Sequence, residues 1–390
     1  MTLDQRIDND LKELYNNGEI SGAVALDGLV QEENEGVYWV DKANGTFTQQ
    51  EKTVINLLKS NSGISIEQLA VQAQMTVAGL ETMLGKLKKN GCDIRNEISF
   101  ATRALPVYTV GKRGAKTVMA MLNPGKGVKA SNNDLLIELK KRSMFTMLEK
   151  LCCGVNSGSA NLGKDIANYH YFNTHYGDWD YNRQDGFDLK QAFFLRDWPK
   201  DSDINLDVSD LNYIIQYQSS KDEMVKKVVA EKKLKAKASV LNNKQQLELI
   251  PYASRKFDKF NPKMIKEVFP YVDTLLEEIF SADRKYVIFC SAIFDEVFKA
   301  YNGYNKQQNR NINVNSTHYD TQLPGLSKKV SCCILDINYY GQNKKAVIAN
   351  TFPRRDITNA YKMMAAYGEF CYNCYCGKHS SNQPHKITLP

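Results

Sequence analysis

The fold class of this 390-residue chain is indicated by the segment TVMAMLNPGKG at residues 117–127. Its first six residues form an apolar run with the length of a buried β-strand. Asn123, Pro124 and Gly125 follow this run directly as a turn. Apolar side chains then recur at helical spacing over residues 134–150. A strand that passes through a sharp loop into a helix is typical of α/β domains.

Three later segments repeat this order of apolar strand and polar loop. Strands are expected at residues 247–250, 285–289 and 346–350, and each of them runs into a loop. The other elements expected here are a strand at 330–337 and helices at 264–280, 292–301 and 357–367. We therefore predict an α/β domain over residues 114–390, with a central, mostly parallel sheet flanked by helices.

Residues 155 to about 245 differ in composition from both flanks, and we interpret them as a large insertion in the α/β domain. Residues 169–187 are rich in aromatic side chains, which form either a small core of the insertion or a platform on which bases stack. Residues 221–239 have a helical pattern with many lysines, which form either a solvated charged face or a surface that follows phosphates.

Residues 46–113 have the pattern of three short helices followed by two strands. A capping box begins the first helix at Thr48, and Thr76 caps the third helix, which has one apolar face. Strands at 92–98 and 107–110 are expected to pair as a β-hairpin. This order resembles the winged helix-turn-helix family.

The resemblance to winged helices implies DNA binding through the third helix. Lys86, Lys88 and Lys89 would then contact the DNA backbone from the last turn of this helix. The alternative is a module for protein interaction or packing that touches no base. Residues 1–45 precede this unit as an N-terminal segment whose pattern says little about function.

Composition and charge limit the class of protein. The chain is 43% hydrophobic and 24% charged, which is ordinary for a folded protein and excludes extensive disorder. No apolar run approaches the roughly 18 residues of a membrane span, and the first residues lack the order of a secretory signal. We therefore expect a cytoplasmic protein without a membrane partner. The net charge of +7 is moderate, so the placement of the basic residues matters more than their total.

The nine cysteines are an odd number, which together with the absence of a secretory signal favours reduced thiols over a disulfide framework. Cys371, Cys374 and Cys376 lie close together in the sequence and, with His379 or His385, could form part of a metal or iron–sulfur site. Zinc sites usually show two ligand pairs at regular spacing, and this group shows one irregular cluster. We favour ordinary thiols and expect neither a metal nor a cofactor.

In an open α/β sheet, ligands bind beyond the carboxyl ends of the strands. Two of the loops expected there carry a family resemblance. The sequence Leu-Asn-Pro-Gly at residues 122–125 looks like the water-positioning loop of the uracil-DNA glycosylase superfamily, closest to its mismatch-specific and single-strand-selective branches. The sequence Ala-Asn-Thr-Phe-Pro-Arg-Arg at residues 349–355 stands where that family has its His-Pro-Ser or Asn-Pro-Ser loop.

This resemblance implies an enzyme that extrudes a nucleotide from DNA and hydrolyses its N-glycosidic bond. It assigns Asn123 to orienting the attacking water. An amide is a poor base, so such a site depends on stabilising the departing base. The residues that the resemblance assigns to the base are Pro124, Gly125, Tyr252, Ser254, Ser291 and Phe352. Those that it assigns to the DNA backbone are Lys126, Arg354 and Arg355.

Two positions depart from the family's pattern. Phe352 holds the place of the His or Asn that helps to stabilise the departing base, and residues 250–252 read Ile-Pro-Tyr where a base-reading asparagine is expected. Either the pocket accepts a different, bulkier base, or the chain binds nucleic acid without cutting it. A third interpretation is a protein-interaction scaffold in which neither domain contacts nucleic acid.

Overall fold

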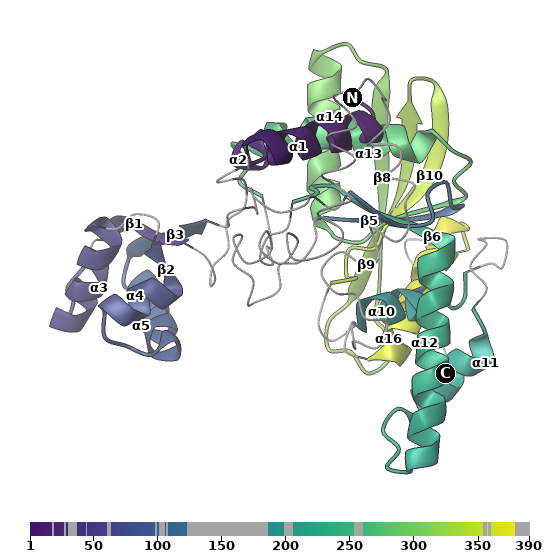
Figure 1. Cartoon of the computed structure of the whole chain (residues 1–390), viewed down its shortest axis with the longest axis horizontal. Coiled ribbons are helices and arrows are strands. Elements are labelled where there is room, and N and C mark those ends of the chain that lie inside the picture. Colours follow the sequence, from purple (N-terminus) through teal and green to yellow (C-terminus); the bar gives the residue numbers. More distant parts are fainter. Residues whose placement is uncertain are drawn as a thin grey trace.

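The computed structural model of the chain describes residues 1–17, 19–26, 29, 37–43, 45–60, 64–97, 100, 106, 108–122, 186–198, 206–252, 260–353, 357 and 360–378. These residues form a seven-stranded sheet and a three-stranded sheet, each with its own helices (Figure 1). The helix predicted at 134–150 lies outside the described residues.

The larger sheet has the strand order β4-β6-β5-β7-β10-β9-β8. Its members are β4 (Thr109–Gly111), β5 (Thr117–Met121), β6 (Lys244–Glu248), β7 (Tyr286–Phe289), β8 (Ile312–Thr321), β9 (Val330–Tyr339) and β10 (Gln342–Ile348). Strands β6, β5, β7 and β10 are mutually parallel neighbours. The other pairings, β4 with β6, β10 with β9 and β9 with β8, are antiparallel.

The sequence analysis predicts a mostly parallel sheet. The observed sheet is mixed, because three of its six strand pairings are antiparallel. Strands β9 and β10 are joined by a tight turn at Tyr340 and Gly341, both of which have positive φ angles. A two-residue turn of this kind joins only antiparallel strands. Strand β8, which the sequence analysis did not predict, adds a third antiparallel member at the sheet edge.

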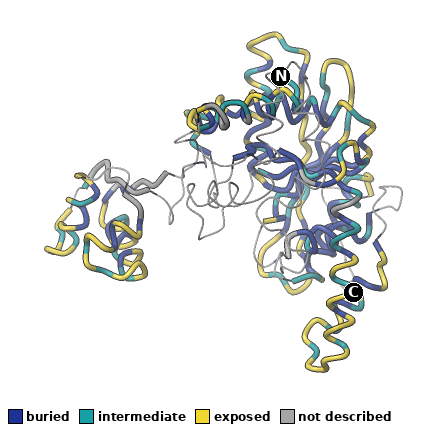
Figure 2. Tube along the Cα trace, in the orientation of Figure 1, coloured by how far each residue is buried: buried dark blue, intermediate teal, exposed yellow. Residues whose placement is uncertain are grey.

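One face of the sheet is covered by α1 (Leu3–Asn17), α13 (Phe269–Phe280) and α14 (Ile293–Gln307) (Figure 1). Apolar residues of these helices form one buried cluster with alternate residues of the strands, such as Val118 and Ala120 of β5. A short 3-10 helix, Ile265–Val268, precedes α13. Figure 2 shows the buried residues concentrated along the sheet and the inner sides of the helices.

The opposite face is covered by α10 (Gly186–Phe194), α12 (Glu223–Asn243) and α16 (Tyr361–Tyr375). Met119 and Met121 of β5 point into this second cluster, as the two-residue period of a strand requires. Helix α11 (Val208–Tyr217) packs beside α12. Helix α16 approaches α10 at Gly368, where an added Cβ would lie 1.8 Å from the carbonyl oxygen of Phe194.

Two parts of the chain that the sequence set apart belong to these clusters. Helices α10 and α12 come from the predicted insertion, and they supply much of the helical layer on their face. The N-terminal segment contributes α1 and α2 (Ser21–Val24), with Leu3, Ile7 and Leu29 buried on the other face. The structure thus draws both segments into the core of the sheet domain.

The smaller unit contains β1 (Val37–Ala43), α3 (Gln49–Ser60), β2 (Ile64–Ser65), α4 (Ile66–Gln72), α5 (Val77–Lys89) and β3 (Cys92–Glu97) around a separate apolar core. Its helix starts confirm the predicted caps. Thr48 and Glu51 exchange the hydrogen bonds of a capping box. The hydroxyl of Thr76 accepts a hydrogen bond from the backbone nitrogen of Gly79 at 3.1 Å.

The β-hairpin predicted for residues 92–98 and 107–110 is wrong. Strand β3 pairs instead with β1, which precedes the three helices, and the sheet order is β2-β1-β3. Residues 109–111 form β4, which pairs with β6 of the larger sheet. The boundaries drawn from the sequence, 1–45, 46–113 and 114–390, therefore differ from the structure at β1 and at β4. The apolar pattern identified strands but not their partners.

Candidate functional site

Four neighbouring strands end side by side at one edge of the larger sheet. Because β6, β5, β7 and β10 are parallel, their carboxyl ends share this edge. Backbone hydrogen bonds continue past the strands, from the nitrogen of Ile250 to the oxygen of Leu122 and from that of Ala349 to the oxygen of Phe289, both at 2.8 Å. We call this region the carboxyl edge.

The strand order also contains a topological switch point. In chain order the parallel strands are β5, β6, β7 and β10, and in the sheet they lie as second, first, third and fourth. After β5, the chain first adds β6 on one side of β5 and then adds β7 on the opposite side of β5. Ligands of doubly wound sheets bind outside the carboxyl ends at such a point. The segment that follows β5 begins beside it.

Several of the predicted site residues lie outside the described residues. They are Asn123, Pro124, Gly125, Lys126, Ser254, Arg354 and Arg355. The aromatic stretch up to residue 185, and His379 and His385, also lie outside them. The strands that precede these segments are described, so the structure fixes where three of the predicted loops begin.

Tyr252, predicted to stack on a base, is only 1% exposed in the core beneath the N-terminal helices. Its hydroxyl donates to Oδ2 of Asp10 at 2.7 Å and lies 3.2 Å from the hydroxyl of Tyr271. Burial raises the pKa of Tyr252 well above its usual value. The ring therefore offers no exposed face to a base in this structure.

Ser291 and Phe352 are also buried, at the carboxyl ends of β7 and β10 respectively. The hydroxyl of Ser291 accepts a hydrogen bond from the backbone nitrogen of Ile293 at 3.3 Å, where α14 begins. The ring of Phe352 meets the ring of Phe194 edge to face, with centroids 5.2 Å apart, in the core under α10. Both residues stand at the predicted edge, and both side chains serve packing or helix initiation.

The lysines predicted to contact DNA are in the smaller unit. Lys86, Lys88 and Lys89 occupy the last turn of α5, as predicted. Lys86 and Lys89 are exposed, and Lys88 is half-buried. A cluster of cations at a helix C-terminus interacts favourably with the helix dipole, whatever else it binds.

A row of buried polar side chains runs along β6 toward the carboxyl edge, on the α10 face. The ammonium group of Lys244 donates to Oε1 of Gln246 at 2.9 Å, lies 3.3 Å from Oδ1 of Asp188, and contacts Gln191 of α10. The row ends at Glu248, which is paired in register with Met121 at the end of β5. The sequence analysis did not select these residues.

Glu248 is the unusual member of this row. Its Oε1 accepts from Nε2 of Gln246 at 2.6 Å, but its buried Oε2 has no hydrogen-bond partner among the described residues. Burial raises the pKa of Glu248 to about 8, against smaller opposing effects of Gln246 and Lys244. The carboxyl group is therefore mainly protonated at neutral pH and can act as a hydrogen-bond donor.

A second group of polar side chains lies on the other face, where β7 and β10 end. It consists of Asp295 in the first turn of α14, His318 of β8, Cys333 of β9 and Asn350, which follows β10. His318 and Cys333 are directly opposite each other in the β8–β9 pairing. We call these four residues the Cys333 cluster.

The distances within the Cys333 cluster are short. Sγ of Cys333 lies 2.9 Å from Nδ1 and 3.9 Å from Nε2 of His318, and Nε2 lies 3.7 Å from Oδ2 of Asp295. Nδ2 of Asn350 donates to Sγ at 3.2 Å. Burial raises the pKa of the Cys333 thiol to about 11, although the hydrogen bond from Asn350 lowers it. Lys299 forms a 2.6 Å ion pair with Asp295.

The remaining cysteine prediction concerns Cys371, Cys374 and Cys376. Cys371 and Cys374 are buried in α16, where both contact the thiol of Cys332, and Cys376 is exposed. The structure thus does not gather the three predicted residues into one group. The seven cysteines among the described residues are free thiols.

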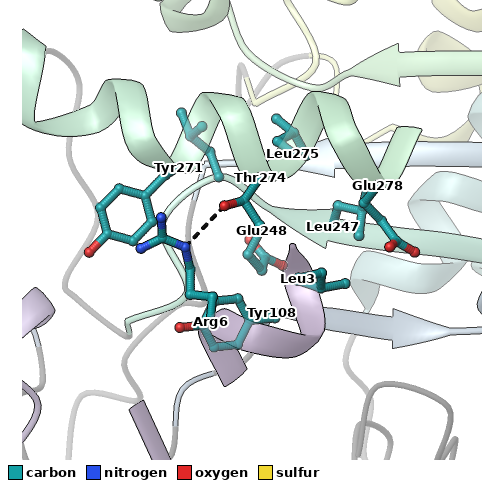
Figure 3. A pocket seen from close by; sticks show the side chains of 10 residues that line it. Leu3, Arg6, Tyr108, Leu247, Glu248, Tyr271, Thr274, Leu275 and Glu278 are labelled. Atoms are coloured by element: carbon teal, nitrogen blue, oxygen red, sulfur yellow. Dashed lines mark hydrogen bonds between the residues drawn. The ribbon is translucent and has the colours of Figure 1, made fainter. Parts of the chain in front are cut away.

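A pocket lies on the α1 side of the sheet, between α1, α13 and β6 (Figure 3). Arg6 crosses it, donating from Nε to the hydroxyl of Thr274 at 3.1 Å and stacking over the ring of Tyr271. Glu278, at its far end, is paired with Arg113. Arg6 and Glu278 thus have protein partners, whereas Glu248, which also lines the pocket, has one carboxyl oxygen without a partner among the described residues. The pocket marks the seam at which α1 packs against the sheet domain.

Sequence reasoning missed Glu248, Asp295, His318 and Cys333. A signal existed for Glu248, the single carboxylate in the apolar run at residues 247–250, because such a group is buried at a cost unless it has a role or a partner. His318 and Cys333 could be joined only through strand register, which the local pattern does not give.

Comparison of the chain with protein-family models, with curated proteins and with solved structures finds no match in any of the three. Among the described residues, no helix has both the length and the apolar character that crossing a bilayer requires. The family and the activity of the chain are therefore matters for proposal.

Proposed function

We propose that this chain acts on DNA and that its sheet domain hydrolyses the N-glycosidic bond of an extruded uracil or modified base. The observation that carries the proposal is the strand order. The four loops singled out in the sequence follow four adjacent parallel strands, and the Asn123 loop leaves β5 beside the switch point. Loops more than two hundred positions apart thus begin at one edge.

The chemistry proposed for this edge needs a water placed against the sugar and a pocket for the base. Asn123 would orient the water through its amide carbonyl. Arg354 and Arg355 would hold the phosphates on either side of the extruded nucleotide, since a guanidinium binds phosphate oxygens in a bidentate manner. The protonated Glu248, at the end of β6, provides a neutral donor next to the start of the Asn123 loop.

The smaller unit is proposed to add affinity for the DNA backbone, in the manner of a winged helix. Lys86 and Lys89 on the last turn of α5 are exposed and would contact phosphates. Contacts of this kind carry little sequence information, so they would position the duplex rather than select a base.

A second function is favoured by two buried aromatic rings. Phe352 and Tyr252, at the places where the resemblance puts base contacts, are both packed in the core. A ring in the place of the family's His or Asn cannot donate a hydrogen bond to a departing base. The alternative is a nucleic-acid-binding protein that has the loop arrangement without the hydrolysis.

The decisive test of activity is an abasic-site assay. Single strands and duplexes that carry uracil or bulky modified bases are incubated with the full chain and then cleaved in alkali. We expect cleavage of at least one substrate, and a loss of about 100-fold or more in Asn123→Ala, because correct placement of the attacking group contributes at this scale. Asn313→Ala, at an exposed amide on β8, is the matched control.

Absence of cleavage from every substrate, with retained DNA binding, would favour the second function. Binding is measured over a range of salt concentrations, because each phosphate contact contributes about 0.9 to the slope of log affinity against log salt. We expect the triple variant of Lys86, Lys88 and Lys89 to alanine to flatten this slope and Lys52→Ala, an exposed lysine of α3, to leave it unchanged. A wild-type slope of zero would exclude both functions.

A further inference from the structure

We propose that Asp295, His318 and Cys333 bind a divalent transition-metal ion of the zinc type. The proposal is independent of the glycosylase activity. The three residues come from three elements far apart in the sequence, and one ligand atom of each lies within 4.8 Å of the others. Thiolate, imidazole and carboxylate are the three ligand types that zinc takes from proteins.

The three side chains lie close enough to share one ion once the His318 ring is oriented toward it. Ligand atoms on a tetrahedral zinc ion are about 3.3–3.6 Å apart, given the usual zinc–ligand bond lengths. Nε2 of His318 is 3.9 Å from Sγ and 3.7 Å from the carboxylate of Asp295. Because Sγ lies nearer to Nδ1, at 2.9 Å, the His318 ring must turn so that one nitrogen faces both the sulfur and the carboxylate. The side chain of His318 is 53% exposed, so its ring is free to make this adjustment.

The charges also match a dication. One thiolate and one carboxylate around a neutral imidazole carry two negative charges. As the metal–sulfur bond forms, the thiol proton of Cys333 is released to solvent, so one proton leaves for each ion bound. Lys299 now pairs with Asp295, but its side chain is 62% exposed and can turn away to solvent. Asn350, which donates to Sγ, would then support the thiolate from the second shell.

Access distinguishes a metal ion from the main rival, a nucleophilic cysteine activated by His318. Cys333 is fully buried, so a substrate carbon cannot approach its sulfur in this structure. The His318 ring is exposed to solvent, and an ion can bind between that ring, the sulfur and the Asp295 carboxylate. Three protein ligands would leave a fourth position for water, which is the arrangement of catalytic rather than structural zinc sites.

The test is a titration of the reduced, full-length chain with Co²⁺, followed by Zn²⁺. Cobalt bound to a thiolate shows charge-transfer absorption, and zinc should displace it. We expect one equivalent of Co²⁺ to bind with this band. Cys333→Ser and His318→Ala should each abolish the band and weaken Co²⁺ binding by more than the roughly 10–100-fold that follows loss of a second-shell partner.

The matched control is Cys332→Ser. Cys332 is the neighbouring residue of β9, but it points to the opposite face, toward Cys371 and Cys374. The Cys332→Ser variant should therefore keep the cobalt–thiolate absorption band. His318→Ala changes an exposed side chain, so it still reports on the site if circular dichroism shows that Cys333→Ser is misfolded. No band in the wild type, or a band lost in Cys332→Ser and kept in His318→Ala, would overturn the proposal.

Discussion

The two faces of the seven-stranded sheet bury charged groups in different ways. On the α13 face, Glu278 accepts hydrogen bonds from Nε and Nη2 of Arg113 at 3.0 and 2.8 Å, and Arg284 lies 3.4 Å away. On the α10 face, Lys244 contacts one carboxylate and two amides, and the row that it begins ends at Glu248, with one oxygen unpaired.

The difference shows how each face meets the cost of burying charge. An ion pair with additional hydrogen bonds can stay ionised in the interior. A carboxyl group without such partners takes up a proton instead, and Glu248 does so with a pKa of about 8. Buried polar atoms without a hydrogen-bond partner nevertheless occur on both faces among the described residues: Oε2 of Glu248 on the α10 face, and Nε of Arg284 and the side-chain amide of Asn305 on the other.

The largest effect is expected from breaking the charge pairing of the α13 face. Glu278→Ala leaves the buried guanidinium of Arg284 without its carboxylate, and Arg113 retains only Asp4. Removal of one partner from a buried pair costs about 3–5 kcal/mol. We expect a loss of this size in the free energy of unfolding by urea. Glu277→Ala, at the half-exposed neighbouring position, should change it little.

On the α10 face, the close approach of α16 to α10 can be tested at Gly368. In Gly368→Ala the new Cβ would overlap the backbone oxygen of Phe194, which cannot move without its helix. Overpacking of this kind costs about 1–3 kcal/mol or more. Gly303→Ala in α14 is the control, since nothing lies within 4 Å of its added Cβ. That change should stabilise the protein by up to about 1 kcal/mol. Equal effects at both positions would contradict the packing described.

The third prediction concerns the pH dependence of stability. The pKa of Glu248 is raised from 4.5 to about 8, so between these values the folded state holds a proton that the unfolded state has lost. The wild type should lose stability as pH rises through this window, by up to about 1.4 kcal/mol per pH unit. Glu248→Gln should remove this slope.

The two curves should meet below pH 4.5, where Glu248 is protonated in both states. Unfolding free energies at several pH values between 4 and 8 check this, with Glu231→Gln as the control. Glu231 is exposed on α12, on the same side of the sheet. A wild type and a Glu248→Gln variant that stay parallel across the window would show that Glu248 is ionised in the fold.

Much of the fold could be predicted because its signals are local. The apolar run at residues 117–122 and the caps at Thr48 and Thr76 identify a strand and two helix starts without reference to the rest of the chain. Strand β8 was not predicted because it lies at the sheet edge, where its sequence, INVNSTHYDT, consists mostly of exposed polar residues and lacks an apolar run. The partner of β3 escaped because register and pairing are set by contacts remote in sequence.

The candidate site likewise has a part that local sequence patterns predict and a part that depends on contacts remote in sequence. The shared edge of β5, β6, β7 and β10 follows from the general rule for α/β sheets, and the sequence located it. The burial of Tyr252 depends on Asp10, 242 residues away, and no local pattern reports that contact. The pairing of His318 with Cys333 likewise requires a register that only the folded sheet supplies.

The seating of the N-terminal helix has a mechanical consequence. The chain is anchored to the sheet domain at Leu29, whose oxygen accepts a hydrogen bond from Asn261, and it is buried in the same core again at Phe100. The smaller unit is therefore inserted between two segments of the chain that both belong to the sheet domain. A pulling force applied at the first residue would act first on the contacts of α1 with the sheet domain. The smaller unit would come under tension only after α1 and the contact at Leu29 had detached.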